Sequence, residues 1–335
     1  MFKKKENRII IIIAVSLLIL FLCSFSMGRY GISVENVIRI ILSRIVPISK
    51  SWTDTMETAV INIRLPRIIL ACLVGCCLSA AGTAYQNVFQ NPMAAPDILG
   101  ASSGACFGAA LAILLGFSKG GVTISAFIFS LITTFVVYLI GSRSSSNQMV
   151  SLILSGIMIS SLFSAGTSFI KLAADPSNQL PAITYWLMGS LSGAKLSDLG
   201  FAVIPMLVGM IPLFLLRWKM NLLSFGDDEA VSMGINVTRL RFVIIFCAGI
   251  LTASSVAASG MIGWVGLVIP HICRKLVGND CRYLLPASML GGAFFLLLTD
   301  DISRHLLAAE IPIGVLTAFI GAPFFIYMII KKEGF

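Results

Sequence analysis

Side chains able to do acid–base chemistry are scarce in this sequence of 335 residues and lie at the edges of its apolar stretches. There are 15 acidic residues and two histidines, His271 and His305. The acidic residues fall in polar segments or near the ends of apolar stretches, as Asp97 does after Pro96. Proton or sodium coupling usually requires ionisable or carbonyl-lined sites near mid-membrane. The inventory therefore argues against an ion-coupled transporter, and we find no Ser/His/Asp grouping typical of a hydrolase.

Nucleotide and metal sites also lack their usual patterns. Gly189, Gly193 and Lys195 occur within seven residues, but without the Gly-x-x-x-x-Gly-Lys-Ser/Thr spacing that cradles phosphates. Cys72 and Cys76 are one helical turn apart, yet buried cysteine is more often a small apolar side chain than a metal ligand. We therefore expect this chain to bind no metal or cofactor and to hydrolyse no ATP.

Most of the chain consists of apolar stretches long enough to cross a bilayer, and the residues discussed above lie within these stretches or near their ends. The chain is 57% hydrophobic and 12% charged, whereas soluble domains carry about a quarter charged residues. About 20 apolar residues span the hydrocarbon core. The clear stretches are 9–27, 68–84, 122–141, 150–170, 201–216, 242–258 and 312–330, and the weaker ones are 98–115, 261–272 and 283–298. The sequence therefore predicts one all-α integral membrane domain over residues 1–335, with about ten transmembrane helices.

The basic residues predict the orientation of these helices. Lysine and arginine concentrate in the alternate loops that would be cytoplasmic if the N-terminus were inside, which follows the positive-inside rule. This distribution explains the net charge of +9 without a nucleic-acid partner. Both termini are then expected in the cytoplasm, together with a short helix at about 226–235. Its acidic start, Asp227 to Glu229, suits the positive end of a helix dipole.

Glycine patterns indicate two further features. Gly100, Gly104 and Gly108 recur every fourth residue, which suits close helix packing but also reflects how common glycine is in membrane helices. Residues 260–266 contain three glycines three residues apart, ahead of Pro270. Irregular backbone at membrane depth is tolerated only where it is buried in protein or lines a cavity. We expect one of these two settings for residues 260–266.

Four segments, in the same order along nearly the whole chain, together resemble one family. They are Arg64-Leu65-Pro66-Arg67; Gln86 with Asn91-Pro92-Met93-Ala94-Ala95-Pro96 and Leu99-Gly100; Gly226-Asp227 with Ala230 and Gly234; and a C-terminal series of Gly263, Val265 to His271, Arg274, Asp280, Arg282, Asp300, Arg304, Pro312-Ile313-Gly314 and Gly321-Ala322-Pro323. The chain resembles the permeases of ATP-binding-cassette importers for ferric siderophores, haem and cobalamin. Its departures, Met93 for leucine and Trp264 for phenylalanine, keep bulky apolar side chains.

The resemblance implies contacts with three kinds of partner: a second permease copy, two ATPase subunits that bind ATP and magnesium, and an extracytoplasmic substrate-binding protein. Arginine forks onto carboxylates, which suits docking of an acidic surface, although arginines at an interface can also snorkel. The residues matching the docking arginines are Arg64, Arg67 and Arg304. Those matching the ATPase-coupling helix are Gly226, Asp227, Ala230 and Gly234; an ordinary amphipathic loop helix is the alternative.

Two further sets match or suit the pathway. Asn91, Pro92 and Met93 match the loop that narrows its inner mouth. Small hydroxyl residues in the apolar stretch 150–170 suit a weakly polar wall for a large solute and equally suit helix packing. They are Ser155, Ser160, Ser164 and Ser168.

The resemblance thus implies a non-enzymatic permease of the prokaryotic cytoplasmic membrane. It would form a dimeric pathway, as a homodimer or with a related permease, for an iron–siderophore complex, haem or cobalamin. The alternative from a different class is a stand-alone, ion-coupled secondary transporter.

Overall fold

The computed structural model describes residues 2–28, 30–44, 46–47, 49–143, 148–224, 226–307 and 309–331. In these residues all regular structure is helical, which confirms the all-α prediction. Among the described residues, seven helices are long and apolar enough to cross a membrane. They are α1 (Phe2–Ser24), the continuous helix formed by α3 (Asp54–Thr58), η1 (Ala59–Arg64) and α4 (Leu65–Val88), α6 (Lys119–Ser142), α7 (Gln148–Ala173), α9 (Leu196–Leu223), α11 (Val237–Ser259) and α13 (Cys281–His305).

The three remaining predicted stretches also coincide largely with helices, but these helices are shorter. They are α5 (Ala101–Leu114), α12 (Val265–Val277) and α14 (Ile313–Ile330). At a rise of 1.5 Å per residue, the 13 residues of α12 cover about 20 Å, which is too short to cross a bilayer unaided. Residues 261–272, one of the weaker predicted stretches, overlap this short helix.

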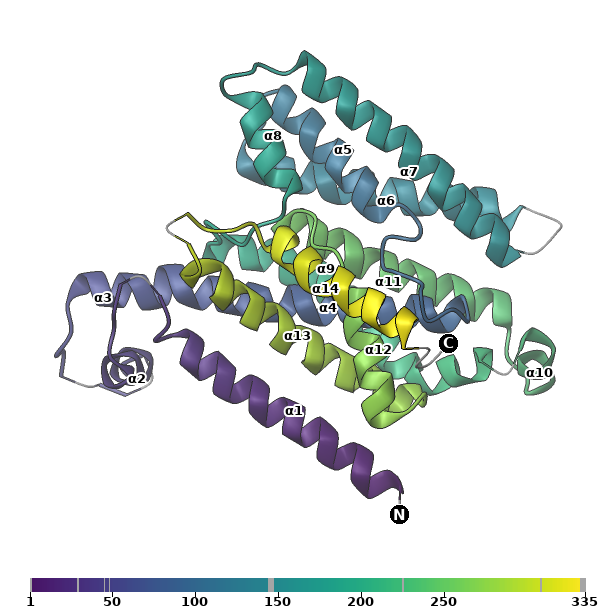
Figure 1. Ribbon diagram of the computed structural model, residues 1–335, viewed down its shortest axis with the longest axis horizontal. Coiled ribbons are helices and arrows are strands. Elements are labelled where there is room, and N and C mark those ends of the chain that lie inside the picture. Colours follow the sequence, from purple (N-terminus) through teal and green to yellow (C-terminus); the bar gives the residue numbers. More distant parts are fainter. Residues whose placement is uncertain are drawn as a thin grey trace.

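The centre of the molecule is α4, which packs against α9, α11, α12 and α13 (Figure 1). Glycines allow two of these close crossings. A Cβ placed on Gly75 would lie 2.2 Å from the carbonyl oxygen of Gly292 in α13, and one on Gly82 would lie 1.7 Å from that of Gly266 in α12. In a membrane such close backbone approach provides the packing that a hydrophobic effect cannot.

A second group of helices, α5, α6, α7 and α8 (Gln179–Leu187), lies above this centre in Figure 1. The glycine pattern of α5 serves packing here. A Cβ on Gly104 would meet the Thr133 hydroxyl of α6 at 2.0 Å, and one on Gly108 would meet the Ser125 carbonyl at 2.6 Å. Gly100 caps α5 with a positive φ of 74°.

The two ends of the helix bundle carry different short elements. The start of α1, the end of α14 and α10 (Asp227–Ser232) lie at one end, on the right of Figure 1. α2 (Val34–Leu42) and α3 lie at the opposite end. The start of α1 and the end of α14 therefore lie on the same side as α10.

Candidate functional site

Arg64, predicted for docking at an outer surface, is enclosed by this chain's own backbone. It lies on η1, the π-helical turn ahead of α4, and is buried. Its guanidinium donates hydrogen bonds of 2.5 Å to the carbonyl oxygens of Phe25 and Tyr30. Arg64 therefore ties the connection after α1 to the start of α4.

Arg67 and Arg304 belong to one buried ionic cluster. Arg67 donates to Asp300 at 3.0 Å and to Glu310 at 2.9 Å. Arg304 pairs with Asp300 at 3.2 Å and also with Asp301, which accepts a 2.5 Å hydrogen bond from the Ser24 hydroxyl. The cluster joins α1, α4, α13 and the segment before α14. Because buried charges require partners, these contacts neutralise charge inside the fold.

The structure thus gives all three arginines internal partners, with Arg67 and Arg304 only 7% exposed. Interfacial snorkelling does not describe this arrangement, since snorkelling would place the guanidinium in water. Glu310, with a side chain 35% exposed, is the accessible edge of the cluster. A docking role for Arg64, Arg67 and Arg304 stays a prediction, and it would require a partner to compete with these contacts.

Two of the four predicted wall serines face a cavity. Ser160 and Ser164 line a space of about 540 Å³, together with Ser161, Gly156 and Asp97. The other two lie elsewhere: Ser155 is buried, and Ser168 is exposed and donates to the Ser164 carbonyl at 3.0 Å. We call the space lined by Ser160, Ser161 and Ser164 the serine cavity.

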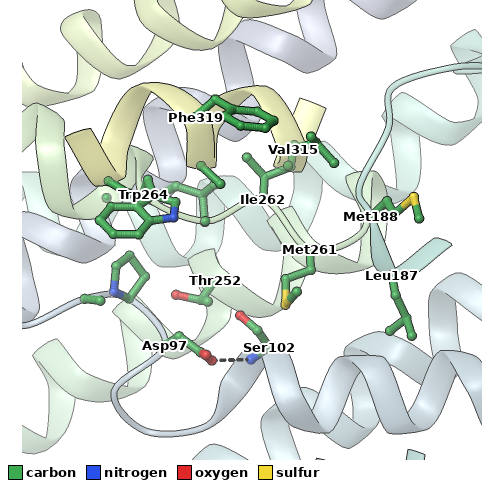
Figure 2. Close-up of a pocket in the computed structure, with 18 of the residues that line it drawn as sticks. Asp97, Ser102, Leu187, Met188, Thr252, Met261, Ile262, Trp264, Val315 and Phe319 are labelled. Atoms are coloured by element: carbon green, nitrogen blue, oxygen red, sulfur yellow. Dashed lines mark hydrogen bonds between the residues drawn. The ribbon is translucent and has the colours of Figure 1, made fainter. Parts of the chain in front are cut away.

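A larger and more apolar cavity of about 730 Å³ lies between α14 and the start of α5 (Figure 2). Residues 261–264, where the chain leaves helix between α11 and α12, form part of its wall, which is one of the two settings expected for residues 260–266. Trp264 has a left-handed φ of 70°, rare for a residue with a side chain. In Figure 2, Phe319 and Val315 of α14 lie opposite Asp97 and Ser102.

Asp97 lines both cavities and was not predicted as a site residue. Its carboxylate accepts a 2.8 Å hydrogen bond from the backbone N–H of Ser102, in the first turn of α5. A carboxylate is favourable there because of the free N–H groups and the helix dipole. Asp97 thus stabilises the start of α5 at the junction of the two cavities.

The predicted inner gate is a tight turn after α4. The Asn91 side chain accepts from the Met93 backbone N–H at 2.8 Å, and the Asn91 carbonyl accepts from Ala94 at 3.0 Å. Pro92 fixes the backbone between them. Met93 is exposed, so this turn presents an apolar side chain as the gate prediction requires; the gating role itself stays a prediction.

The predicted coupling helix is present as α10, but its two small residues have different settings. Ala230 is fully buried where α10 packs on α9 and α11, so its small side chain seats α10 on this chain; its part in ATPase coupling stays a prediction. Gly234 is open, and its φ of 80° ends the helix. Gly226, with φ of 113°, begins it, and Asp227 pairs with Arg241 at 2.8 Å.

Polar contacts that the sequence did not reveal connect the gate turn to the polypeptide leading into α10. Gln90, at a φ of 47°, donates a 2.6 Å hydrogen bond to the Leu223 carbonyl at the end of α9. Asn87 donates to the Ser224 hydroxyl at 3.0 Å. These two contacts join the residues next to the gate turn to the end of α9, a few residues ahead of α10.

Asp280 fixes the neighbouring start of α13. Its carboxylate accepts from Asn221 of α9 at 2.7 Å and from the backbone and guanidinium of Arg282. Partial burial alone would raise the pKa of Asp280, but the hydrogen bonds from Arg282 and Asn221 outweigh it and hold the pKa below its ordinary value. The ionised form therefore stabilises the fold at neutral pH.

Comparison with known proteins agrees with this arrangement. Residues 16–331 match the FecCD transport family. The chain belongs to the FecCD transport family. The molybdate import system permease protein MolB of Haemophilus influenzae is 40% identical over 318 residues, covering 95% of this chain and 94% of its own. The hemin transport system permease protein HmuU of Yersinia pestis is 37% identical over 324 residues, covering 95% and 93%.

A solved structure extends the match to three dimensions. It is described as an inward-facing conformation of a metal-chelate type ABC transporter and aligns with a TM-score of 0.87 and 39% identity, covering 97% of this chain and 99% of that one. This FecCD chain is therefore a permease subunit of an ATP-binding-cassette importer and a multi-pass protein of the cytoplasmic membrane. The family resemblance predicted from the sequence is confirmed, and a stand-alone secondary transporter is no longer the alternative.

Proposed function

We propose that this FecCD chain forms a dimeric pathway for a metal chelate, with a ferric siderophore as the substrate and haem or cobalamin as the next candidates. The relatives bear the names of iron chelatin, hemin, Fe(3+)-citrate, cobalamin and molybdate permeases. Chelated iron is the commonest theme among these names, whereas molybdate is a small oxyanion.

The observation that carries the pathway proposal is the polar face of α7. Ser161, Ser164 and Ser168 are exposed on a helix apolar enough to cross the membrane. Ser161 and Ser168 each donate to the carbonyl four residues earlier, which satisfies the hydroxyl without making it apolar. Such a face fits a water-filled pathway or a second permease copy better than acyl chains.

Coupling would run through α10 from a partner ATPase that binds ATP and magnesium. With Ala230 buried, the side chains that α10 leaves accessible for a groove on the ATPase include Val231 and Met233. The contacts of Gln90 and Asn87 with the end of α9 would carry the movement to the turn at Met93. Both chain termini and α10 would then be cytoplasmic, while α2 and α3 would lie on the side of the membrane from which the binding protein docks.

Reconstituted uptake tests this function. The permease, its ATPase and its binding protein are placed in proteoliposomes, and uptake of an iron-loaded siderophore, haem, cobalamin, ferric citrate and molybdate is compared with and without ATP. We expect ATP-dependent siderophore uptake and none from a proton gradient alone. Uptake of molybdate without any chelate would overturn the substrate, and gradient-driven uptake would overturn the mode of transport.

A variant pair tests the serine cavity in the same assay. Ser164→Phe fills the cavity and should lower uptake strongly, because the wall serines leave space for a large solute. Leu162→Phe adds a similar ring on the same helix at a residue that does not line this cavity, and should retain uptake. Equal uptake by both variants would contradict the assignment of this cavity to the pathway.

A further inference from the structure

The connection between α1 and α4 contains a well-formed helix, α2. The side chain of Ser33 caps it by accepting from the Asn36 backbone N–H at 3.3 Å. Glu35 and Arg39, one turn apart, form a 2.7 Å ion pair along its surface. Both features stabilise a helix locally, so α2 is an ordered element and not a passing turn in a loop.

α2 has an apolar arc that the protein covers only in part. Val37 and Ile40 are buried where α2 packs on the rest of the chain. Beside them, Val34, Ile38 and Leu42 recur every fourth residue and are 59%, 50% and 43% exposed. Residues at this spacing form one continuous stripe along a helix. We call Val34, Ile38 and Leu42 the α2 stripe.

The direction of α2 differs from that of the spans. Figure 1 views α2 along its own axis, whereas α1, α4 and α13 run across the picture. α2 therefore lies across the spans, parallel to the plane of the membrane. An amphipathic helix in this orientation fits the boundary between headgroups and acyl chains, with its apolar face inward and its polar face in water.

Exposed apolar side chains also occur on the elements next to α2. α1 crosses the membrane with Leu18 and Leu22 exposed. Past the end of α1, Met27 and Tyr30 remain exposed, and tyrosine is enriched at membrane–water interfaces. η1, which α2 contacts, exposes Ile63. Exposed apolar side chains thus occur on α1, on the segment that follows it, on η1 and on α2.

We propose that α2 is an interfacial anchor whose stripe inserts between phospholipid acyl chains in the leaflet opposite α10. Glu35 and Arg39, which lie off the stripe, remain at the water side. Inserted in this way, α2 holds the connection that supplies the Phe25 and Tyr30 carbonyls to Arg64, and so fixes the start of α4 at the membrane surface. This role does not depend on which solute the importer carries.

Photo-crosslinking from lipid tests the proposal. The intact importer is placed in phosphatidylcholine nanodiscs that contain a phospholipid with a diazirine in the upper part of its acyl chain, and adducts are mapped by mass spectrometry after irradiation. We expect adducts on Val34, Ile38 and Leu42 and on the internal control Leu22, with Glu35 and Arg39 unmodified. Adducts on Leu22 without any on the stripe would overturn the proposal.

A water-soluble diazirine and two variants that each introduce a lysine complete the test. The soluble probe should modify Glu35 and Arg39 and spare the stripe; modification of the stripe from water would also overturn the proposal. Ile38→Lys should abolish most lipid adducts on Val34 and Leu42, whereas Glu35→Lys, on the polar face, should leave them. Protein–protein crosslinks from the stripe in place of lipid adducts would assign it to a second copy or to the binding protein.

Discussion

Replacement of Arg67 by alanine should destabilise the protein before it affects any docking partner. Within the described part of the chain, the variant leaves Asp300, which is fully buried, with Arg304 as its one charged partner, and it removes the ion pair of Glu310. Removal of one member of a buried ion pair costs about 3–5 kcal/mol. The remaining Arg304 contact places the expected loss near the lower end, at about 3 kcal/mol, which corresponds to a drop in Tm on the order of 5 °C for a chain of this size.

The assay is thermal unfolding in detergent, followed by a thiol-reactive dye that reports exposure of buried cysteines such as Cys77 and Cys247. Arg39→Ala is the matched control, because it breaks an exposed ion pair worth about 0–1 kcal/mol. Adding Asp300→Ala to Arg67→Ala should recover part of the loss by removing the stranded carboxylate. An unchanged Tm for Arg67→Ala, with binding-protein affinity lost, would refute this reasoning and favour docking.

Three further predictions concern packing, coupling and pH. Gly82→Ala should lower the free energy of unfolding by about 3 kcal/mol or more, because the added Cβ would lie 1.7 Å from the Gly266 carbonyl oxygen. Gly120→Ala is the control, since a Cβ there meets nothing within 4 Å, and the yield and Tm of the two variants are compared. Gln90→Ala should lower uptake per ATP hydrolysed while the complex stays assembled; an unchanged transport-to-ATP ratio would contradict the link to α9. Because folding lowers the pKa of Asp280, its ionised carboxylate adds to the free energy of unfolding above about pH 4, and this contribution is lost as pH falls through the folded pKa. The Tm of Asp280→Asn should therefore fall less than that of the unmodified protein when the pH is lowered below about 4.

The positions of the main helices could be predicted because length and hydropathy are local properties. Each of the ten apolar stretches coincides largely with a helix, and even the short 261–272 segment corresponds to an irregular wall followed by α12. α2 escaped prediction because its nine residues lie in a stretch that reads as polar overall. The spacing of Val34, Ile38 and Leu42 after the cap at Ser33 was the signal that could have revealed it.

The settings of the site residues could not be predicted, because they depend on contacts between distant parts of the chain. The partner of Arg67 lies 233 residues away in α13, and nothing near Arg67 in the sequence indicates that it is buried. Similarly, the burial of Ala230 against α9 and α11 follows from packing between separate helices, which the residues around Ala230 do not indicate. The serines of α7 share a helix, but the cavity that receives Ser160 and Ser164 is completed by Asp97 from another segment.

The composition of the native complex tests the central claim most directly. The tagged chain is extracted from its own membrane in mild detergent, and the mass of the intact assembly is measured. We predict two permease chains, either two copies of this chain or one with a related permease, bound to two copies of a nucleotide-binding subunit. Recovery of this chain only as a lone monomer, under conditions that preserve a known importer, would contradict the account.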